Sequence, residues 1–217
     1  MAGTLLHEGG HFITGKALGY DASLHYGYTN FDKNSTSREL QKYYDRWGST
    51  GIVDTNKVRA QQFDQLLAKQ FEENKLIIWG GPLQTMLTGT IGFLLLIIYR
   101  KYIVRKQTLN IRQWLLVFFS LFWLRQVANA ATALFIKLPM TGIEGVVGDE
   151  IKLAVYYHLP DMSLVFGTAA IGLLISVLTI FIFIPARQRL TFIAAGLFGG
   201  LTGFISWFFF AGPWLMP

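Results

Sequence analysis

Residues 7–11 read His7-Glu8-Gly9-Gly10-His11, within a stretch whose composition is typical of a helix. Because the two histidines are four positions apart, both imidazoles lie on one helical face and can reach a single metal ion. Catalytic zinc takes three protein ligands and leaves its fourth position to water. Glu8 follows the first histidine, and its carboxylate can take a proton from that water and pass it to a leaving amine. The stretch therefore predicts two zinc ligands and a general base.

A structural role is the alternative interpretation of the two histidines, packed or hydrogen-bonded on a buried helix. The chain has only four histidines, so the pattern rarely arises by chance. It has no cysteine, so a metal ion must be held by His, Asp or Glu. We favour the metal site on these grounds.

The composition of the chain is that of a membrane protein. Of its 217 residues 52% are hydrophobic, including 18 Phe and 6 Trp, and the mean hydropathy is +0.38. The net charge of +6 does not point to nucleic acid, because the basic residues flank long apolar runs, where lysine and arginine anchor membrane spans. We expect a single membrane-embedded domain over residues 1–217, with the lipid bilayer as its surroundings.

Four apolar runs are each long enough to cross a bilayer, at about 76–99, 114–136, 163–184 and 190–211. Residues 2–19 can form a helix about 27 Å long. It is too polar to face lipid, so we expect other helices to surround it. The predicted fold is an all-α, multi-pass helical bundle whose first helix carries the HExxH pattern, with about four further transmembrane helices.

The segment 20–75 is the one long polar stretch between the first helix and the second span. Apolar and polar residues alternate over 24–28, which predicts a small strand or hairpin element. Residues 30–51 carry turn formers and balanced charge, and we expect an irregular segment there. A helix is predicted from residue 54, lying on the membrane surface before the next span.

The run 114–136 contains Arg125, Gln126 and Asn129. An arginine at that depth normally faces the interior of the bundle or water and pairs with an acid. Two interpretations stay open: Arg125 pairs near the active site or binds a substrate carbonyl, or it snorkels or forms a structural ion pair.

The linker between the second and third long runs is the only stretch between spans that is rich in acid. Glu144, Asp149 and Glu150 are therefore candidate third ligands, and Asp149, just after a glycine at a helix start, is the most natural of them. A plain N-terminal helix cap is the alternative role for that aspartate. His25 is a weaker candidate. A short helix is expected after Asp149, ended by Pro160.

Three blocks of the sequence carry a resemblance to a known family. HEGGHFITGKALGY, residues 7–20, resembles the first-helix signature of the site-2 protease family of intramembrane zinc metalloproteases. GGPLQT, residues 80–85, resembles that family's second signature, a glycine-proline turn that opens the next core helix. GDEIKLA, residues 148–154, is similar to the third-ligand region of a compact branch that lacks a PDZ domain. The blocks cover most of residues 1–160. Thr85 stands where the family usually has asparagine, and the usual Leu-Asp-Gly around the aspartate is absent.

The resemblance implies a zinc-dependent intramembrane endopeptidase that hydrolyses peptide bonds of membrane-protein substrates. It implies one zinc ion on His7, His11 and Asp149, with Glu8 activating the zinc-bound water. Arg125, Asn129, Tyr26 and Thr85 are candidates for support of the site or for substrate binding. An extended substrate must find backbone hydrogen bonds, and a strand at 24–28 can supply them by β-addition.

Two other classes of protein stay open. A catalytically inactive, site-2-protease-like membrane scaffold would keep the ligands without the reaction, although it has no evident need for Glu8. A metal transporter would need ligands along a path through the membrane, whereas here they cluster at one helix and one linker. The positive-inside rule makes the basic linker 100–112 cytoplasmic, while the resemblance implies the reverse, so the orientation stays open.

Overall fold

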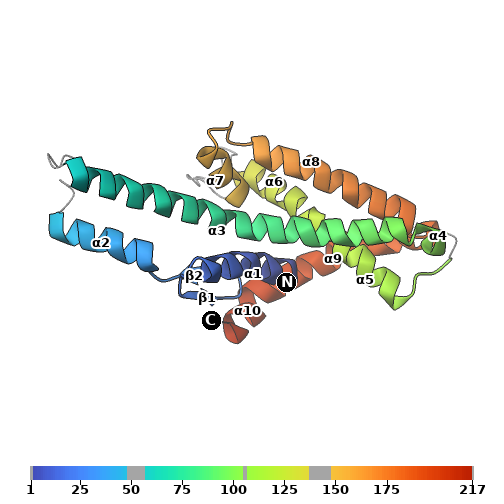
Figure 1. The fold of residues 1–217 in the computed structure, drawn as a ribbon. Coiled ribbons are helices and arrows are strands. Elements are labelled where there is room, and N and C mark those ends of the chain that lie inside the picture. The colour runs from blue at the N-terminus through green and yellow to red at the C-terminus, as the bar shows by residue number, and fades with distance from the viewer. Residues whose placement is uncertain (1, 48–56, 105–106, 137–147, 217) are drawn as a thin grey trace.

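The structure is a computed structural model that describes residues 2–47, 57–104, 107–136 and 148–216. It is mostly helical, with one small β-hairpin after the first helix (Figure 1). The elements run in the order α1 (Ala2–Ala17), β1 (Ala22–Leu24), β2 (Thr29–Phe31), α2 (Ser35–Trp47), α3 (Lys57–Ile98), α4 (Arg100–Ile103), α5 (Ile111–Ser120), η2 (Leu121–Trp123), α6 (Leu124–Ile136), α7 (Asp149–Tyr156), α8 (Ser163–Leu178), η3 (Thr179–Phe183), α9 (Ala186–Ser206), η4 (Trp207–Ala211) and α10 (Gly212–Leu215).

The first helix, α1, ends close to the predicted position. Gly19 has a φ of +81°, the left-handed conformation that a residue without Cβ adopts most readily. The N–H of Tyr20 donates to the carbonyl of Gly15 at 2.9 Å, and that of Gly19 donates to Lys16 at 3.0 Å. This pair of bonds is the Schellman ending, which satisfies the last carbonyls of the helix and turns the chain into β1.

Helices α1 and α3 run antiparallel and in contact, because glycines on both helices let the backbones approach. A Cβ added at Gly10 would lie 2.2 Å from the carbonyl oxygen of Gly80, and one added at Gly80 would lie 2.6 Å from that of Gly10. Neither backbone oxygen can move aside without breaking its helix. Gly10 and Gly80 therefore set how closely the two helices cross.

Helix α3 is a single helix of 42 residues, which corrects two expectations. The predicted surface helix is the N-terminal half of α3 and continues directly into the apolar half, because no Gly or Pro interrupts residues 57–79. The segment 80–85, expected to form a turn, also lies inside the helix, and Pro82 removes only one backbone hydrogen bond from it.

The polar end of the molecule is built around Glu73, a buried carboxylate of α3. It accepts hydrogen bonds from Tyr20 Oη at 3.1 Å, Asn34 Nδ2 at 2.8 Å and Thr36 Oγ1 at 2.9 Å. Asn34 in turn caps α2, since its Oδ1 accepts from the N–H of Ser37. The expectation of an irregular segment over 30–51 was wrong for β2 and for α2, which lies along the N-terminal half of α3 (Figure 1).

The predicted hairpin is present, but of residues 24–28 only Leu24 belongs to a strand. β1 pairs antiparallel with β2, Ala22 opposite Phe31 and Leu24 opposite Thr29, and residues 25–28 form the connection. The alternation therefore covered the turn of the hairpin rather than one of its arms.

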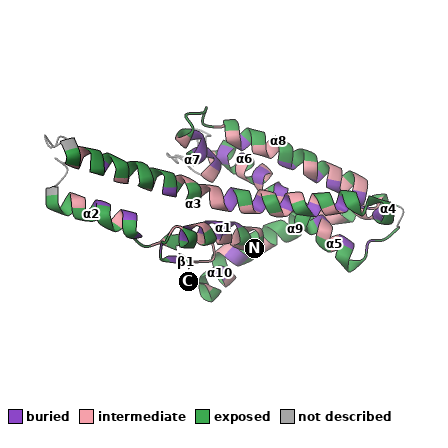
Figure 2. Ribbon diagram, in the orientation of Figure 1, coloured by how far each residue is buried: buried purple, intermediate pink, exposed green. Residues whose placement is uncertain are grey.

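Four helical stretches are long and apolar enough to cross a membrane, as the sequence predicted. They are Val58–Ile98, Ile111–Ile136, Ser163–Phe183 and Ala186–Leu215. Burial differs among them (Figure 2): the buried residues of α3 recur every three or four positions from 73 to 96 and so share one face of the helix, whereas α9 has no buried residue. One apolar core lies where α3, α5 and η3 meet, around Leu96, Val117 and Ile184.

Candidate metal centre

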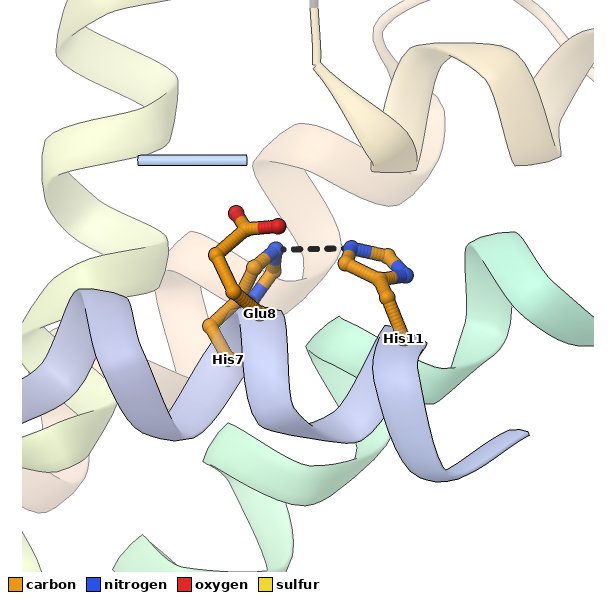
Figure 3. Close-up of side chains that lie close together, drawn as sticks. All are labelled: His7, Glu8 and His11. Carbon is orange, nitrogen blue, oxygen red and sulfur yellow. Dashed lines mark hydrogen bonds between the residues drawn. The ribbon is translucent and has the colours of Figure 1, made fainter. Parts of the chain in front are cut away.

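Two histidines of α1 and one aspartate of α7 bring three ligand atoms together. His7 Nε2 and His11 Nε2 lie 3.2 Å apart (Figure 3). Asp149 Oδ2 lies 2.9 Å from the first and 3.1 Å from the second. Ligand atoms that hold zinc tetrahedrally at about 2.0–2.1 Å are about 3.3–3.4 Å from one another. The three distances are each somewhat shorter than that edge, so the atoms converge as on one face of such a tetrahedron and would move slightly apart around an ion.

The other ring nitrogen of each histidine is already engaged. His11 Nδ1 lies 2.6 Å from the carbonyl oxygen of Ile77, which can only accept, so Nδ1 carries the proton. His7 Nδ1 lies 3.2 Å from Thr85 Oγ1, whose own proton goes to the carbonyl of Gly81 at 3.1 Å. The hydroxyl therefore accepts from His7 Nδ1. Both rings are held in the tautomer that leaves Nε2 as a lone pair, the form that binds metals.

The charge of Asp149 suits a cation at the same point. An aspartate carboxyl ordinarily ionises well below neutral pH, and the positive charge of Arg125 interacts with this one. The group is therefore an ionised carboxylate. With both Nε2 atoms deprotonated, the three atoms are all acceptors within 3.2 Å of one another, and a cation between them removes their mutual repulsion. The donor set fits a zinc ion.

Gly81 of α3 lies directly against the Nε2 atoms of both histidines. A Cβ at this position would lie 2.3 Å from His11 Nε2 and 2.6 Å from His7 Nε2. The rings cannot swing away, because each is fixed through its Nδ1. Only glycine leaves room here for the two rings and for an ion between them.

Glu8 belongs to the same buried cluster. His7, Glu8 and His11 offer ligand atoms that all lie within 4.8 Å of one another. The carboxylate of Glu8 projects over the two rings (Figure 3). The hydroxyl of Thr29, the first residue of β2, lies 3.2 Å from Glu8 Oε2 and 2.9 Å from the Glu8 backbone oxygen. This contact with the hairpin holds Glu8 beside His7 and His11.

Arg125 of α6 places a positive charge near the acidic groups of the site. Its charge interacts with those of Glu8, Asp149 and Glu150, and its buried Nε atom has no hydrogen-bond partner among the described residues. Asn129 lies one turn further along and donates from Nδ2 to Glu150 Oε1 at 3.1 Å. Glu150, 3% exposed, is thus held by Asn129 and supplies none of the three ligand atoms.

Of the other residues named from the sequence, Thr85 lies at the site, and Tyr26 and His25 lie in the hairpin connection. The N–H of Tyr26 donates to the carbonyl of Met216 at 3.2 Å, and its carbonyl accepts from Trp207 Nε1 at 2.8 Å. Both backbone groups of Tyr26 are thus used by the C-terminal segment. His25 stacks on Tyr28 and is not part of the cluster around His7. Glu144 lies outside the described residues.

Three groups at the site were not foreseen from the sequence: the hydroxyl of Thr29, the carbonyl of Ile77 and the Cα of Gly81 against the two histidine rings. Thr29 follows a turn of the hairpin, and nothing in its neighbours marks it. The glycine pair at 80–81 was the one available indication, since a glycine inside an apolar helix commonly marks a close approach. Comparison of the chain with known protein families, with characterised proteins and with solved structures found no match.

Proposed function

We propose that this chain is a multi-pass membrane protein and a zinc-dependent endopeptidase that cleaves membrane-protein substrates. One observation carries the proposal: two neutral imidazoles and one ionised carboxylate meet within 3.2 Å, beside the carboxylate of Glu8. The first three are a ligand set of catalytic zinc sites, and the fourth is the usual general base of HExxH enzymes. The resemblance of residues 7–20 to the site-2 protease signature supports the same reaction.

The residues divide the work of peptide hydrolysis between them. When bound, a zinc ion supplies a Lewis acid that acidifies water and polarises the peptide carbonyl. His7, His11 and Asp149 would hold it. Glu8 takes a proton from the attacking water and delivers it to the leaving amine, while Thr29 keeps its carboxylate in place. Arg125 stabilises negative charge that develops near Glu8 and Asp149.

The depth of the site favours delivery of water. The apolar half of α3 begins after Lys75, and Ile77, Gly81 and Thr85 are the α3 residues that contact the histidines. At about 1.5 Å per residue, Gly81 lies about 8 Å below the start of the apolar run. Water therefore needs to cross only a short distance from the membrane surface.

An extended substrate can form backbone hydrogen bonds with a strand of the hairpin. β2 begins at Thr29, which contacts Glu8, so this strand lies directly beside the reacting groups. A two-stranded sheet has an outer edge on each strand, and a substrate segment can pair there by β-addition. Because the C-terminal segment already occupies the backbone of Tyr26, the pairing falls on the strands and not on the connection.

The geometry of Glu8 favours an enzyme over an inactive scaffold. A scaffold needs the ligands alone, yet Glu8 is buried at the site and held by its own hydrogen bond. A transporter is less favoured. Within the described ranges, the metal-capable side chains gather at one place and do not follow a path through the bundle.

The test is zinc content, by elemental analysis of detergent-purified protein, with cleavage of a membrane-anchored peptide measured in parallel. Wild type is expected to carry close to one zinc per chain. Asp149→Ala and His11→Ala should lose it, because each leaves two ligands. Glu8→Gln should keep the zinc and lose cleavage, since the amide cannot accept the proton.

His25→Ala is the matched control, because it removes a histidine near the hairpin without touching the ligand atoms, and it should keep both zinc and cleavage. Wild type without zinc would overturn the proposal. Zinc that survives in Asp149→Ala but is lost in Glu8→Gln would make Glu8 the third ligand and remove the general base from the mechanism.

A further inference from the structure

A cavity of about 1050 Å³ lies away from the metal centre, at the end of the bundle where α4 and α5 meet the beginning of α9. In Figure 1 this is the end at which α3 passes into α4 and η3 leads into α9. The cavity is lined by residues of α5, of the turn 182–185 and of the first three turns of α9. None of them takes part in the metal centre.

One wall of the cavity is aromatic. Trp114 and Phe192 stack with ring centroids 5.3 Å apart, and Phe118 lies 6.1 Å from Phe192. Together they join α5 to α9 beside the apolar core around Leu96. Tryptophan is enriched at the boundary between lipid tails and headgroups, and Trp114 near the start of a candidate span is consistent with that position. A hydrocarbon chain can pack against this wall.

The other wall carries two arginines. Arg189 donates from Nε to the carbonyl of Ile184 at 2.9 Å and from Nη2 to that of Phe181 at 2.6 Å. A guanidinium has five N–H groups, so three remain for another acceptor. Arg187, which lines the same cavity, is exposed. Both residues belong to the first turn of α9, where Arg189 is held by its two hydrogen bonds and the N–H groups of the helix add partial positive charge.

No acid balances these charges. The sequence has no Asp or Glu between Glu73 and Glu144 and none after Asp161. The described residues of the same end add the exposed basic residues Arg100, Lys101 and Arg112. The cavity therefore offers a cationic rim and an apolar wall to a molecule that is anionic at one end and apolar at the other.

We propose that the cavity binds one anionic phospholipid. Arg187, Arg189 and the first turn of α9 hold its phosphate, and an acyl chain lies on Trp114, Phe118 and Phe192. This inference depends on the membrane location of the chain and not on zinc or proteolysis.

Native mass spectrometry of the full-length protein tests this binding, by titration with phosphatidylglycerol and with phosphatidylcholine of the same acyl chains. Wild type is expected to bind phosphatidylglycerol at least fivefold more tightly. Arg187→Gln should weaken that binding about fivefold, since one basic residue near the surface contributes about that factor. Arg187 is chosen because Arg189 also holds the turn before α9.

Ala195→Trp fills the apolar part of the cavity without changing charge and should weaken both lipids. Arg112→Gln is the matched control, an exposed arginine of the same end outside the cavity, and should leave binding unchanged. Equal affinity for the two lipids would overturn the proposal, as would an Arg112→Gln effect as large as that of Arg187→Gln. Displacement of the lipid by millimolar inorganic phosphate would show a site for a free anion instead.

Discussion

The contact of α1 with α3 and the surface of α9 both contain closely spaced glycines, and they use them in opposite ways. At Gly10, Gly80 and Gly81 a Cβ would collide with backbone or ring atoms. At Gly196 and Gly199 nothing lies within 4 Å. The first set permits polar groups to be buried between helices, whereas α9 presents apolar side chains outward. Glycine spacing alone therefore does not identify a packed interface, and the partner of each glycine decides its role.

The largest expected difference between the two sets of glycines is in zinc content, and Gly81→Ala tests it. The added methyl group would occupy the space between the two Nε2 atoms, so zinc content should fall from close to one per chain to near zero. Gly199→Ala in α9 is the matched change and should keep the full content. Elemental analysis of both proteins measures the difference, and normal zinc in Gly81→Ala would show that the rings do not meet where the structure has them.

Truncation of an apolar side chain should lower the free energy of unfolding much more in α3 than in α9. Leu96 is fully buried between α3, α5 and η3, whereas Phe198 in α9 is 72% exposed. Leu96→Ala is expected to lower the free energy of unfolding in detergent by about 3 kcal/mol, because it leaves a cavity. Phe198→Ala should change it by less than about 0.5 kcal/mol. Equal losses would mean that Phe198 packs against protein.

Of the Gly81, Leu96 and Thr29 substitutions, Thr29→Val should have the smallest effect. It tests whether the hairpin supports Glu8. The valine keeps the shape of the side chain but loses the hydrogen bond to Glu8. Turnover of a membrane-anchored peptide should fall about tenfold, which corresponds to about 1.4 kcal/mol, with zinc content unchanged. A loss of zinc would instead show that Thr29 supports the ligands, and Thr29→Ser should restore most of the activity.

Local geometry explains which parts of the site could be predicted. His7, Glu8 and His11 lie within one and a half turns of a helix, so their spacing determines that they share a site. Asp149 was reached only as a choice within an acid-rich linker, because 138 residues separate it from His11. Thr29 and the carbonyl of Ile77 depend on how the hairpin and α3 pack on α1, and no local pattern encodes such contacts.

In the fold, too, features that depend on local sequence could be predicted, and those that depend on remote contacts could not. Long apolar runs predicted the four candidate spans, because length and hydropathy are local properties. Helix α2 was missed because most of its residues are polar, and its place is fixed by the remote contacts of Asn34 and Thr36 with Glu73. The change from charged to apolar residues near 75 suggested a boundary within α3, but backbone hydrogen bonding continues through such a change.

Helix α3 continues without interruption from the polar end of the molecule into its apolar part. Its 42 residues span about 63 Å, roughly twice the thickness of the hydrocarbon layer. About 28 Å of it, residues 57–75, therefore project beyond the apolar half. No break in the helix separates residues 57–75 from Ile77, whose carbonyl orients His11. The orientation of the His11 ring is therefore tied to the direction of the whole helix, from its polar end to its apolar end.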